Sequence, residues 1–398
     1  MAIQNTSNLS DSIRAQYLSN YVEGALGYRL YDQIAAPVGA NMSELKRGSN
    51  IRVPFISKLD PSTQTLSESA DVVPATLVDT YADITPTTRA NAIQWSQLLE
   101  TQVYTNYTAK AYQALGENMA ESIDLLAQAE ALGGDLVIRA AARASLDAGT
   151  ASNRLSKSVF VKAASWLKAL KVPSFLTPRG GKWVAIFHPW ALVDLLADTE
   201  LVAVGEYQMS GLILNGELGE LLDFKIVCDP RAKVFWGAGA DNTSNVATTL
   251  ATAASRLDKT ITVAADTNIA AGQCLKIGTE ETADTHYATN EMVYVASISS
   301  TTVTIIGEGE NGGLRYSHDS GAAVRNADSA VPIVFGGSES LAKVYDTELG
   351  GEYGEVVGPK KDGILDQWTT LGWKWRGGYD LISENRVIRA EVASSMEA

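Results

Sequence analysis

Acidic side chains form three close groups in the second half of the chain. Carboxylate oxygens are the ligands that divalent cations prefer, and a pair of carboxylates can also act as the acid and base of a glycosidase. The spacing lacks the EF-hand pattern with its central glycine, and such groups are common in solvated loops. We interpret these groups as solvated acidic loops: Glu280, Glu281 with Asp284; Glu308 with Glu310; and Glu352 with Glu355.

The potential nucleophiles and bases are isolated in the sequence. His188, His286 and His318 have no catalytic or metal-binding partner at a recognisable spacing, so a satisfied core or surface histidine is the favoured interpretation. Cys228 and Cys274 lack a CxxC neighbour, and we expect two free core cysteines. The sequence contains no phosphate-binding GxxxxGK loop, GxSxG elbow or HExxH pair. We expect no enzyme, no cofactor and no metal; an enzyme with an unrecognised site is the alternative.

Three tryptophans lie close together near the C-terminal end: Trp368, Trp373 and Trp375. In a strand, Trp373 and Trp375 share one face. A base-stacking platform for nucleic acid is one interpretation. Because Trp is also enriched in cores and at subunit interfaces, we favour a core and interface role.

The charge balance opposes a nucleic-acid-binding module. The chain has 32 Lys and Arg against 46 Asp and Glu, a formal net charge of −14. Proteins that wrap DNA or RNA neutralise phosphates with basic side chains. An acidic wall repels DNA instead, which is compatible with a container.

The length of the chain, and the lack of a predicted membrane span or signal peptide, lead us to expect a folded protein made in a cytoplasm. Its 398 residues are enough for two or three packed units. No apolar run reaches the roughly 18 residues that a membrane span needs. The first residues, MAIQNTSNLSDSIRAQYLSN, lack the apolar core of a signal peptide.

The N-terminal quarter predicts a helix followed by a long extended arm. Apolar residues spaced as on one helix face occur from Tyr17 to Ile34. Residues 51–56 alternate like a strand, and a second extended run over residues 78–93, interrupted at Pro86, follows a polar tract. A hairpin with about 15 residues per side would be about 50 Å long, and an isolated two-stranded hairpin is marginal in water. We expect the arm to rest on another subunit; a disordered surface loop is the alternative.

The middle of the chain alternates helical and extended patterns. An apolar stripe predicts one long helix over residues 97–131, with Asp124 and Gln128 off the apolar face, and a second helix over residues 135–147. Helices are then predicted at 158–170 and 190–198, and strands at 183–187 and 224–227, which indicates an α/β or α+β unit.

From residue 241 the composition changes to Thr, Ala, Gly and Ser with short β-runs. Strands at 260–263, 274–277, 292–298 and 301–306 predict a small β-sandwich or barrel between flexible flanks. Strands return at 332–336, 366–375 and 385–393, and residues 394–398 are predicted to be a free tail.

The order of these parts resembles the Hong Kong 97-type major capsid proteins of tailed phages. The amino-acid sequences of four segments are similar to those of the branch named after phage N-four: VAIFHPW at 184–190, GELGELLDFKIV at 216–227, LGWKW at 371–375 and NRVIRAE at 385–391. The resemblance implies an α+β Hong Kong 97-type fold with an inserted small β-domain. It assigns the chain as follows: N-terminal arm 1–48, E-loop 49–96, spine helix and peripheral domain 97–154, axial domain 155–240, inserted β-domain 241–327, and axial return with peripheral strands 328–398.

The resemblance also implies a function: a structural shell subunit that forms homo-hexamers and homo-pentamers of an icosahedral head around double-stranded DNA, without sequence-specific binding and without a membrane. Scaffolding, portal and decoration proteins are possible partners, and the virion capsid, assembled in the bacterial host cytoplasm, is the expected location. The alternatives are an encapsulin-like cellular compartment and a β-domain surface adhesin.

Two sets of residues are then candidates for contact. The candidates for contact between subunits are Arg52, Phe55, Lys58, Asp60, Asp71, Asp79, Tyr81, Arg89 and Trp95. The candidates for exposed positions on the inserted β-domain are Glu280, Glu281, Asp284, His286, Arg315 and His318.

Overall fold

The computed structural model describes residues 29–37, 51–56, 59, 61–62, 74–77, 79–102, 107–140, 142–177, 180–198, 220–242, 244–278, 289–338, 340–346, 351–362 and 366–397. The chain divides into two compact units, which are described separately. Unit 1 comprises residues 1–127 and 339–383, and unit 2 comprises residues 128–338 and 384–398. The assignment of segments to an arm, a peripheral domain, an axial domain and an insertion stays a prediction.

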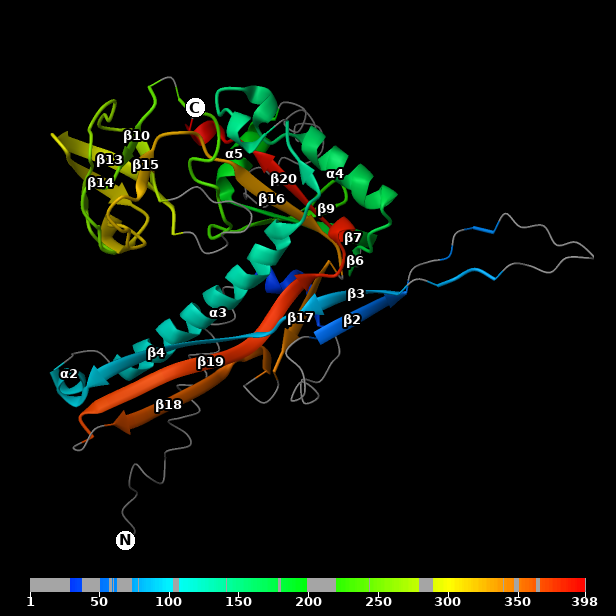
Figure 1. The fold of residues 1–398 in the computed structure, drawn as a ribbon, viewed down its shortest axis with the longest axis horizontal. Coiled ribbons are helices and arrows are strands. Elements are labelled where there is room, and N and C mark those ends of the chain that lie inside the picture. The colour runs from blue at the N-terminus through cyan, green and yellow to red at the C-terminus, as the bar shows by residue number, and fades with distance from the viewer. Residues whose placement is uncertain are drawn as a thin grey trace, which may run out of the picture. The chain divides into compact units, whose positions relative to one another are not determined.

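A long strand, β19, organises the sheet of unit 1. β4 pairs with it along one edge, while β18 and then β17 pair along the other, and β1 adds to β17 in parallel (Figure 1). Leu371, Trp373 and Trp375 share one face of β19 and are buried. The bounds are β1 Ala35–Pro37, β4 Thr87–Ser96, β17 Leu341–Tyr345, β18 Glu355–Asp362 and β19 Trp368–Leu381.

The predicted long helix is present as two helices, α2 (Gln97–Gln102) and α3 (Tyr107–Gly133). The apolar stripe of α3 is buried at Leu115, Met119 and Ile123, as its 3.6-residue period predicts. Trp373 donates a hydrogen bond from Nε1 to Asn118 Oδ1 of α3 at 3.2 Å, so the tryptophan face of β19 lies against this helix.

One prediction for α3 is wrong: Asp124 and Gln128 are buried and do not lie on a solvent face. Asp124 Oδ1 accepts the backbone N–H groups of Tyr31 and Asp32 at 2.8 and 3.2 Å. The carboxylate therefore anchors residues 31–32 on the helix, a long-range contact that helical periodicity does not contain. The described end of the predicted N-terminal helix is a 3-10 turn, Asp32–Ile34, that leads directly into β1, and residues 17–28 of that prediction lie outside the described residues.

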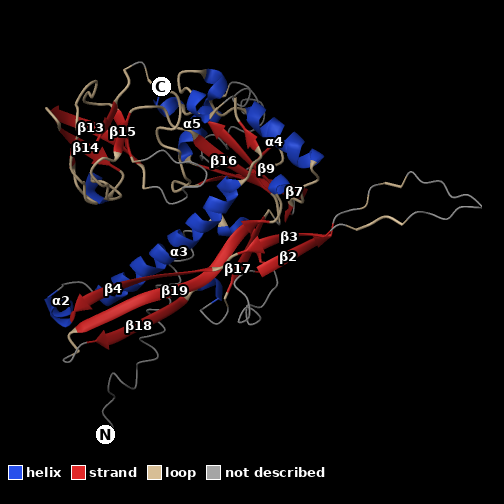
Figure 2. Ribbon diagram, viewed as in Figure 1, coloured by secondary structure: helices blue, strands red, loops and turns tan. Residues whose placement is uncertain are grey.

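Strands β2 (Ile51–Ile56) and β3 (Asp79–Ile84) pair antiparallel as the predicted hairpin (Figure 2). Ile51 and Ile84 are buried with Ala342 and Val344 of β17, which anchors the base of the hairpin in unit 1. The expectation that residues 87–93 continue the second arm strand is wrong, because β4 leaves the hairpin after Pro86 and pairs with β19 over ten residues. Proline has no N–H to donate and so favours this break.

The core of unit 2 is a mixed sheet in the order β5-β20-β16-β7-β9-β8, with β6 on β7. Phe160 and Leu167 of α4 and Ala191 and Leu195 of α5 lie in the same hydrophobic cluster as Phe335 and other residues of this sheet. The predicted helices and strands of this region are confirmed to within a few residues. The bounds are β5 Val137–Ile138, α4 Lys157–Ala169, β6 Phe175–Thr177, β7 Gly180–Phe187, α5 Pro189–Ala197, β8 Glu220–Leu221, β9 Phe224–Cys228, β16 Val331–Gly336 and β20 Val387–Val392.

The predicted helix over residues 135–147 is wrong. Val137 and Ile138 form β5, which pairs in parallel with Arg389 and Ala390 of β20, and only a short 3-10 turn follows at Arg143–Ser145. The helical pattern of this segment is overridden by a strand partner about 250 residues away in sequence.

Between β9 and β16 the chain forms an antiparallel sheet in the order β10-β15-β12-β13-β14-β11. An isolated bridge between Leu250 and Val263 joins its two ends, with Ala251 N–H to Thr262 O at 2.8 Å, so the sheet closes into a small barrel. The bounds are β10 Ala247–Thr249, β11 Thr260–Thr262, β12 Cys274–Ile277, β13 Glu291–Ser299, β14 Thr302–Gly307 and β15 Ala323–Arg325.

The flanks of the barrel are ordered by hydrogen bonds to each other, which corrects the expectation of flexible flanks. Gly239 N–H donates to Asp328 O at 2.7 Å, and Asp328 N–H donates to Ala240 O at 2.9 Å. A Cβ atom on Gly239 would lie only 2.7 Å from Leu146 O and 2.8 Å from Asp328 O, so this close approach requires glycine.

The last described residues are also fixed, so the predicted free tail is wrong. Glu397 lies in a 3-10 turn, Ser395–Glu397, and its carboxylate forms a buried ion pair with Lys276 of β12 at 3.1 Å. It also accepts a hydrogen bond from Ser329 Oγ at 2.7 Å. In addition, Met292 of β13 lies in the hydrophobic cluster of the central sheet. The barrel is therefore docked on that sheet by shared core and by a buried ion pair.

Candidate functional site

The base of the β2–β3 hairpin carries an ordered group of exposed side chains. Arg52 of β2 and Asp83 of β3 face each other in the ladder and form a bidentate pair, with Nε–Oδ1 2.8 Å and Nη2–Oδ2 2.9 Å. The guanidinium also stacks on Tyr81, 3.6 Å from the ring centroid. Arg52 and Tyr81 are nevertheless 58% and 57% exposed. These three residues, here called the hairpin triad, form a pre-organised surface on the hairpin.

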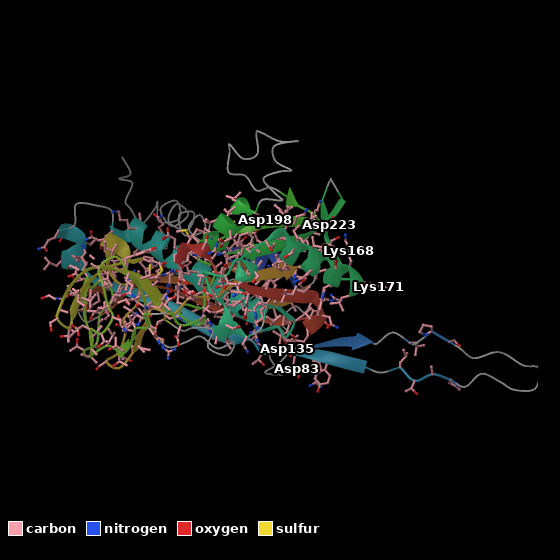
Figure 3. All side chains as sticks on the ribbon, turned by 90° about the horizontal axis from the view of Figure 1, so that it is seen from above. Asp83, Asp135, Lys168, Lys171, Asp198 and Asp223 are labelled. Atoms are coloured by element: carbon pink, nitrogen blue, oxygen red, sulfur yellow. The ribbon has the colours of Figure 1, made fainter. Side chains whose placement is uncertain are left out.

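The hydrogen bond within the triad stabilises the charged forms of both Arg52 and Asp83. The hydrogen bond from Arg52 is the main cause that lowers the pKa of Asp83, and the same bond raises the pKa of Arg52. Both groups remain ionised at neutral pH, and Figure 3 labels Asp83 at the base of the hairpin. The triad can therefore offer a flat cation, an aromatic ring and a carboxylate to one partner.

The other predicted contact residues divide into three groups. Phe55 and Asp79 lie on β2 and β3, while Lys58, Asp60 and Asp71 lie outside the described residues. Arg89 is half-buried on β4. The prediction for Trp95 is wrong: only 3% of the residue is exposed, and its ring packs edge-on against that of Tyr107, with 5.4 Å between the ring centroids. A side chain enclosed by its own subunit cannot contact a neighbour, so Trp95 is a core residue.

Large apolar side chains, of which the sequence analysis singled out only Trp368, are exposed at one end of the unit 1 sheet. Helix α2 has no buried residue, and Leu98 is 65% exposed. Trp368, the first residue of β19, is also exposed and pairs with Ser96, directly before α2. Gln97 N–H donates to Gln367 O at 2.9 Å, which keeps the start of α2 beside Trp368. Leu98, Leu99 and Trp368 are called the α2 patch below.

The tryptophan group therefore separates into two roles. Trp373 and Trp375 are buried, which rules out a base-stacking platform and supports the core interpretation. Trp368 alone of the three is available to a partner. The two-residue period of a strand carries this difference, because it places Trp368 on the face opposite to Trp373 and Trp375.

A second group of exposed apolar side chains lies on the helices of unit 2. It includes Trp166 on α4 and Leu196 on α5, 48% and 50% exposed, although the opposite faces of both helices are buried. Lys168 of α4 forms an ion pair with Asp223, and both residues are labelled in Figure 3. The members of this group, the α4–α5 patch, are Val161, Trp166, Leu170, Val193 and Leu196.

The predicted exposed residues of the barrel are only partly described. Glu280, Glu281, Asp284 and His286 lie outside the described residues. Arg315 is half-buried, with Nη1 3.9 Å from Glu308. The prediction that His318 is exposed is wrong: only 5% of the residue is exposed, and its Nε2 lies 2.8 Å from Glu291 Oε1. Glu291 also accepts the backbone N–H groups of Arg315 and Tyr316, so this pair holds the loop before β15.

The acidic groups that are described have cationic partners. Nζ of Lys343 lies 2.9 Å from Oε1 of Glu352, and Nζ of Lys374 lies 3.4 Å from Oε2 of Glu355. Burial, partly offset by Arg315, raises the pKa of Glu308. Within the described ranges, no cluster of three or more His, Cys, Asp and Glu side chains could hold a metal ion. In the same part of the chain, no helix is long and apolar enough to cross a membrane.

Comparisons with known proteins give a match at the level of fold. No model of a known protein family matches the chain, and no curated protein sequence matches it. The chain is similar in structure to the capsid asymmetric unit of cyanophage Pam1, with 14% identity over 94% of this chain and 92% of that chain and a TM-score of 0.52.

Two further capsid structures match to a similar extent. The acidic stable capsid of Helicobacter pylori bacteriophage KHP30 has 10% identity over 90% of this chain and 87% of that chain, with a TM-score of 0.51. The asymmetric unit of the bacteriophage PhiM1 mature capsid has 9% identity over 91% and 86%, also with a TM-score of 0.51. The chain therefore has the fold of bacteriophage capsid proteins, the α+β Hong Kong 97-type class that the order of its segments predicts.

Proposed function

We propose that this chain is the structural major capsid protein of a tailed bacteriophage and that it assembles into homo-hexamers and homo-pentamers of an icosahedral head enclosing double-stranded DNA. The observation that carries the proposal is the fold: about nine-tenths of this chain superposes on about nine-tenths of capsid subunits. Because the whole chain and not one module matches, the role of the whole protein is the natural inference. The expected location is the virion capsid, after assembly in the host cytoplasm.

The hairpin is the first proposed contact between subunits. Within the described residues, β2 and β3 pair only with each other, which leaves two strand edges with unpaired backbone groups. A two-stranded sheet of this kind gains stability when another surface covers it. We infer that a neighbouring subunit provides that surface and that the hairpin triad contacts it. This is the E-loop role expected from the resemblance.

The two apolar patches supply further contacts. Exposed Trp and Leu side chains that cluster are typical of interface cores, while those scattered singly need no explanation. We propose that the α2 patch and the α4–α5 patch are each covered by another copy of the chain. Every contact can be weak, because a closed shell engages many of them at once.

The net charge of −14 fits a container for DNA. A subunit with this charge repels phosphate and does not need to bind particular base sequences. We propose no sequence-specific contact with the packaged DNA. Separate scaffolding, portal and decoration proteins are proposed as partners on the strength of the family resemblance alone.

The proposal is tested by negative-stain electron microscopy of the purified chain after size-exclusion chromatography, with and without co-expressed neighbouring phage proteins. Closed shells, or rings of five or six subunits, are expected. A monomer that stays monodisperse at every concentration and salt condition, including with those proteins present, would contradict it. Particles that enclose a cellular cargo protein and no DNA would favour the encapsulin-like alternative.

Two variants assign the role of the hairpin. Arg52→Ala removes the centre of the triad, and deletion of residues 61–73 shortens the tip. We expect both proteins to stay folded, because an exposed ion pair contributes little to stability, and to assemble poorly. The matched control is Arg256→Ala, an exposed arginine on the barrel. Normal shells from both hairpin variants would contradict the contact role.

A further inference from the structure

A buried carboxylate in unit 2, Glu391, lies among three arginine side chains. Its side chain has no exposed area. Oε1 lies 2.7 Å from Nη2 of Arg143 and 3.0 Å from Nε of Arg389, and Oε2 lies 3.0 Å from Nη1 of Arg139. These four residues are called the arginine cluster.

The fold brings the arginine cluster together from three segments. Arg389 and Glu391 are two residues apart on β20 and share one face, while Ile388, Ala390 and Val392 face the hydrophobic cluster on the other side. β5 pairs with β20, and the chain that leaves β5 carries Arg139 and Arg143 over this face. The guanidinium of Arg143 also stacks on Phe235, 3.9 Å from its centroid, which fixes its plane.

The charges of the arginine cluster do not balance. Three guanidinium groups face one carboxylate, and Asp135 is the one further acidic group among those that shift the pKa of Arg389. The buried ionic group of unit 1 is different: Arg29 and Lys343 face Asp32 and Glu352, two cations with two carboxylates. An excess of buried positive charge is costly unless an anion accompanies it.

Two donors of the arginine cluster make no hydrogen bond. The Arg389 side chain is 7% exposed, and its Nε and Nη1 are both buried without a hydrogen-bond partner, although Nε lies within ion-pair distance of Glu391. Burial, together with the charges of Arg143 and Arg139, lowers the pKa of Arg389 although Glu391 opposes this. The Arg139 side chain is 34% exposed, so the cluster is reached from solvent on that side.

We propose that Arg139, Arg143 and Arg389 form a binding site for a small inorganic oxyanion of the phosphate type, with Glu391 as the fixed counter-group that holds the guanidinium groups in place. Planar guanidinium forks match the oxygen geometry of such an anion, and its negative charge balances the excess of the cluster. A side chain from a second copy fits less well, because two of the three guanidinium groups are only 7% and 17% exposed. The proposal is independent of shell assembly.

The test is titration of the full-length, unassembled chain with inorganic phosphate, followed by ³¹P NMR or calorimetry at constant ionic strength. Saturable binding is expected. Arg139→Gln should weaken it about tenfold or more, since a charge-assisted hydrogen bond is lost. The matched control, Arg256→Gln, removes an exposed arginine elsewhere in the same unit and should leave the affinity unchanged. Arg139 is chosen because Arg143 and Arg389 still pair with Glu391 in the variant.

A second readout separates specific binding from charge screening. Phosphate should raise the Tm of the wild-type chain and of Arg256→Gln more than sodium chloride of equal ionic strength does, and this extra rise should shrink in Arg139→Gln. Absence of saturable binding to the wild-type chain would overturn the proposal. Equal affinity in Arg139→Gln, or an equal loss in Arg256→Gln, would overturn it as well.

Discussion

At the scale of single residues, the His188 side chain both caps the start of helix α5 and packs against aromatic residues of the core. It precedes Pro189, the first residue of α5, and its Nδ1 accepts the backbone N–H of Trp190 at 3.3 Å. The ring also packs edge-on against Trp236 and has a hydrogen bond to the backbone of Pro230. Both ring nitrogens are thus used by the neutral imidazole, and burial lowers the pKa of His188 to about 4.

We expect this histidine to make unit 2 less stable in mild acid. The unfolded chain binds a proton near pH 6.5 and the folded chain only near pH 4, so the stability is fully present above pH 6.5 and is lost as the pH falls towards 4. The loss is at most about 3 kcal/mol for a shift of this size. His188→Asn keeps a capping side chain but does not titrate. Its Tm should fall less than that of the wild-type chain between pH 7 and pH 5, measured on unassembled protein; equal falls would contradict the assignment.

At the scale of elements, the docking of the barrel depends on β12 and the C-terminal 3-10 turn. Lys276 and Glu397 are 4% and 2% exposed, and 3.1 Å separates Nζ from Oε1. A buried ion pair adds little net stability, but removal of one partner leaves the other charge uncompensated.

We therefore expect Glu397→Gln to lower the free energy of unfolding by about 3 kcal/mol. The double variant Lys276→Met with Glu397→Gln should be more stable than Glu397→Gln alone, because the unpaired ammonium is removed. Urea unfolding of the unassembled chain measures both. The single variant Lys276→Met completes the comparison: a double variant that loses the sum of the two single effects would show that the groups are not coupled.

At the scale of the whole molecule, the net charge of −14 opposes the association of identical copies. Salt screens this repulsion, since the Debye length falls from about 30 Å at 0.01 M to about 8 Å at 0.15 M. Shell or ring formation at fixed protein concentration should therefore rise over this range, as measured by light scattering and electron microscopy. Assembly that decreases with salt would indicate that attractive ion pairs, such as those of the hairpin triad, dominate the contacts.

The sequence by itself determined the local elements and the class of fold. Strands and helices with a clear period, such as α4, β7 and β13, appear close to their predicted places because the period reports which face of an element is buried. The order of the segments predicted the capsid fold. The inter-subunit role of Arg52 and Tyr81 remains a prediction, although both are exposed.

Only the tertiary structure decided which residues meet across long separations in sequence. The pairing of β5 with β20 changed residues 137–138 from a predicted helix to a strand. The contacts of His318 with Glu291 and of Lys276 with Glu397 placed His318 and Glu397 in the interior, although the sequence pattern assigned them to a surface and to a free tail. The same is true of the arginine cluster, whose members come from residues 139–143 and 389–391. Periodicity describes one element at a time, whereas burial of a charge depends on the partner that another segment supplies.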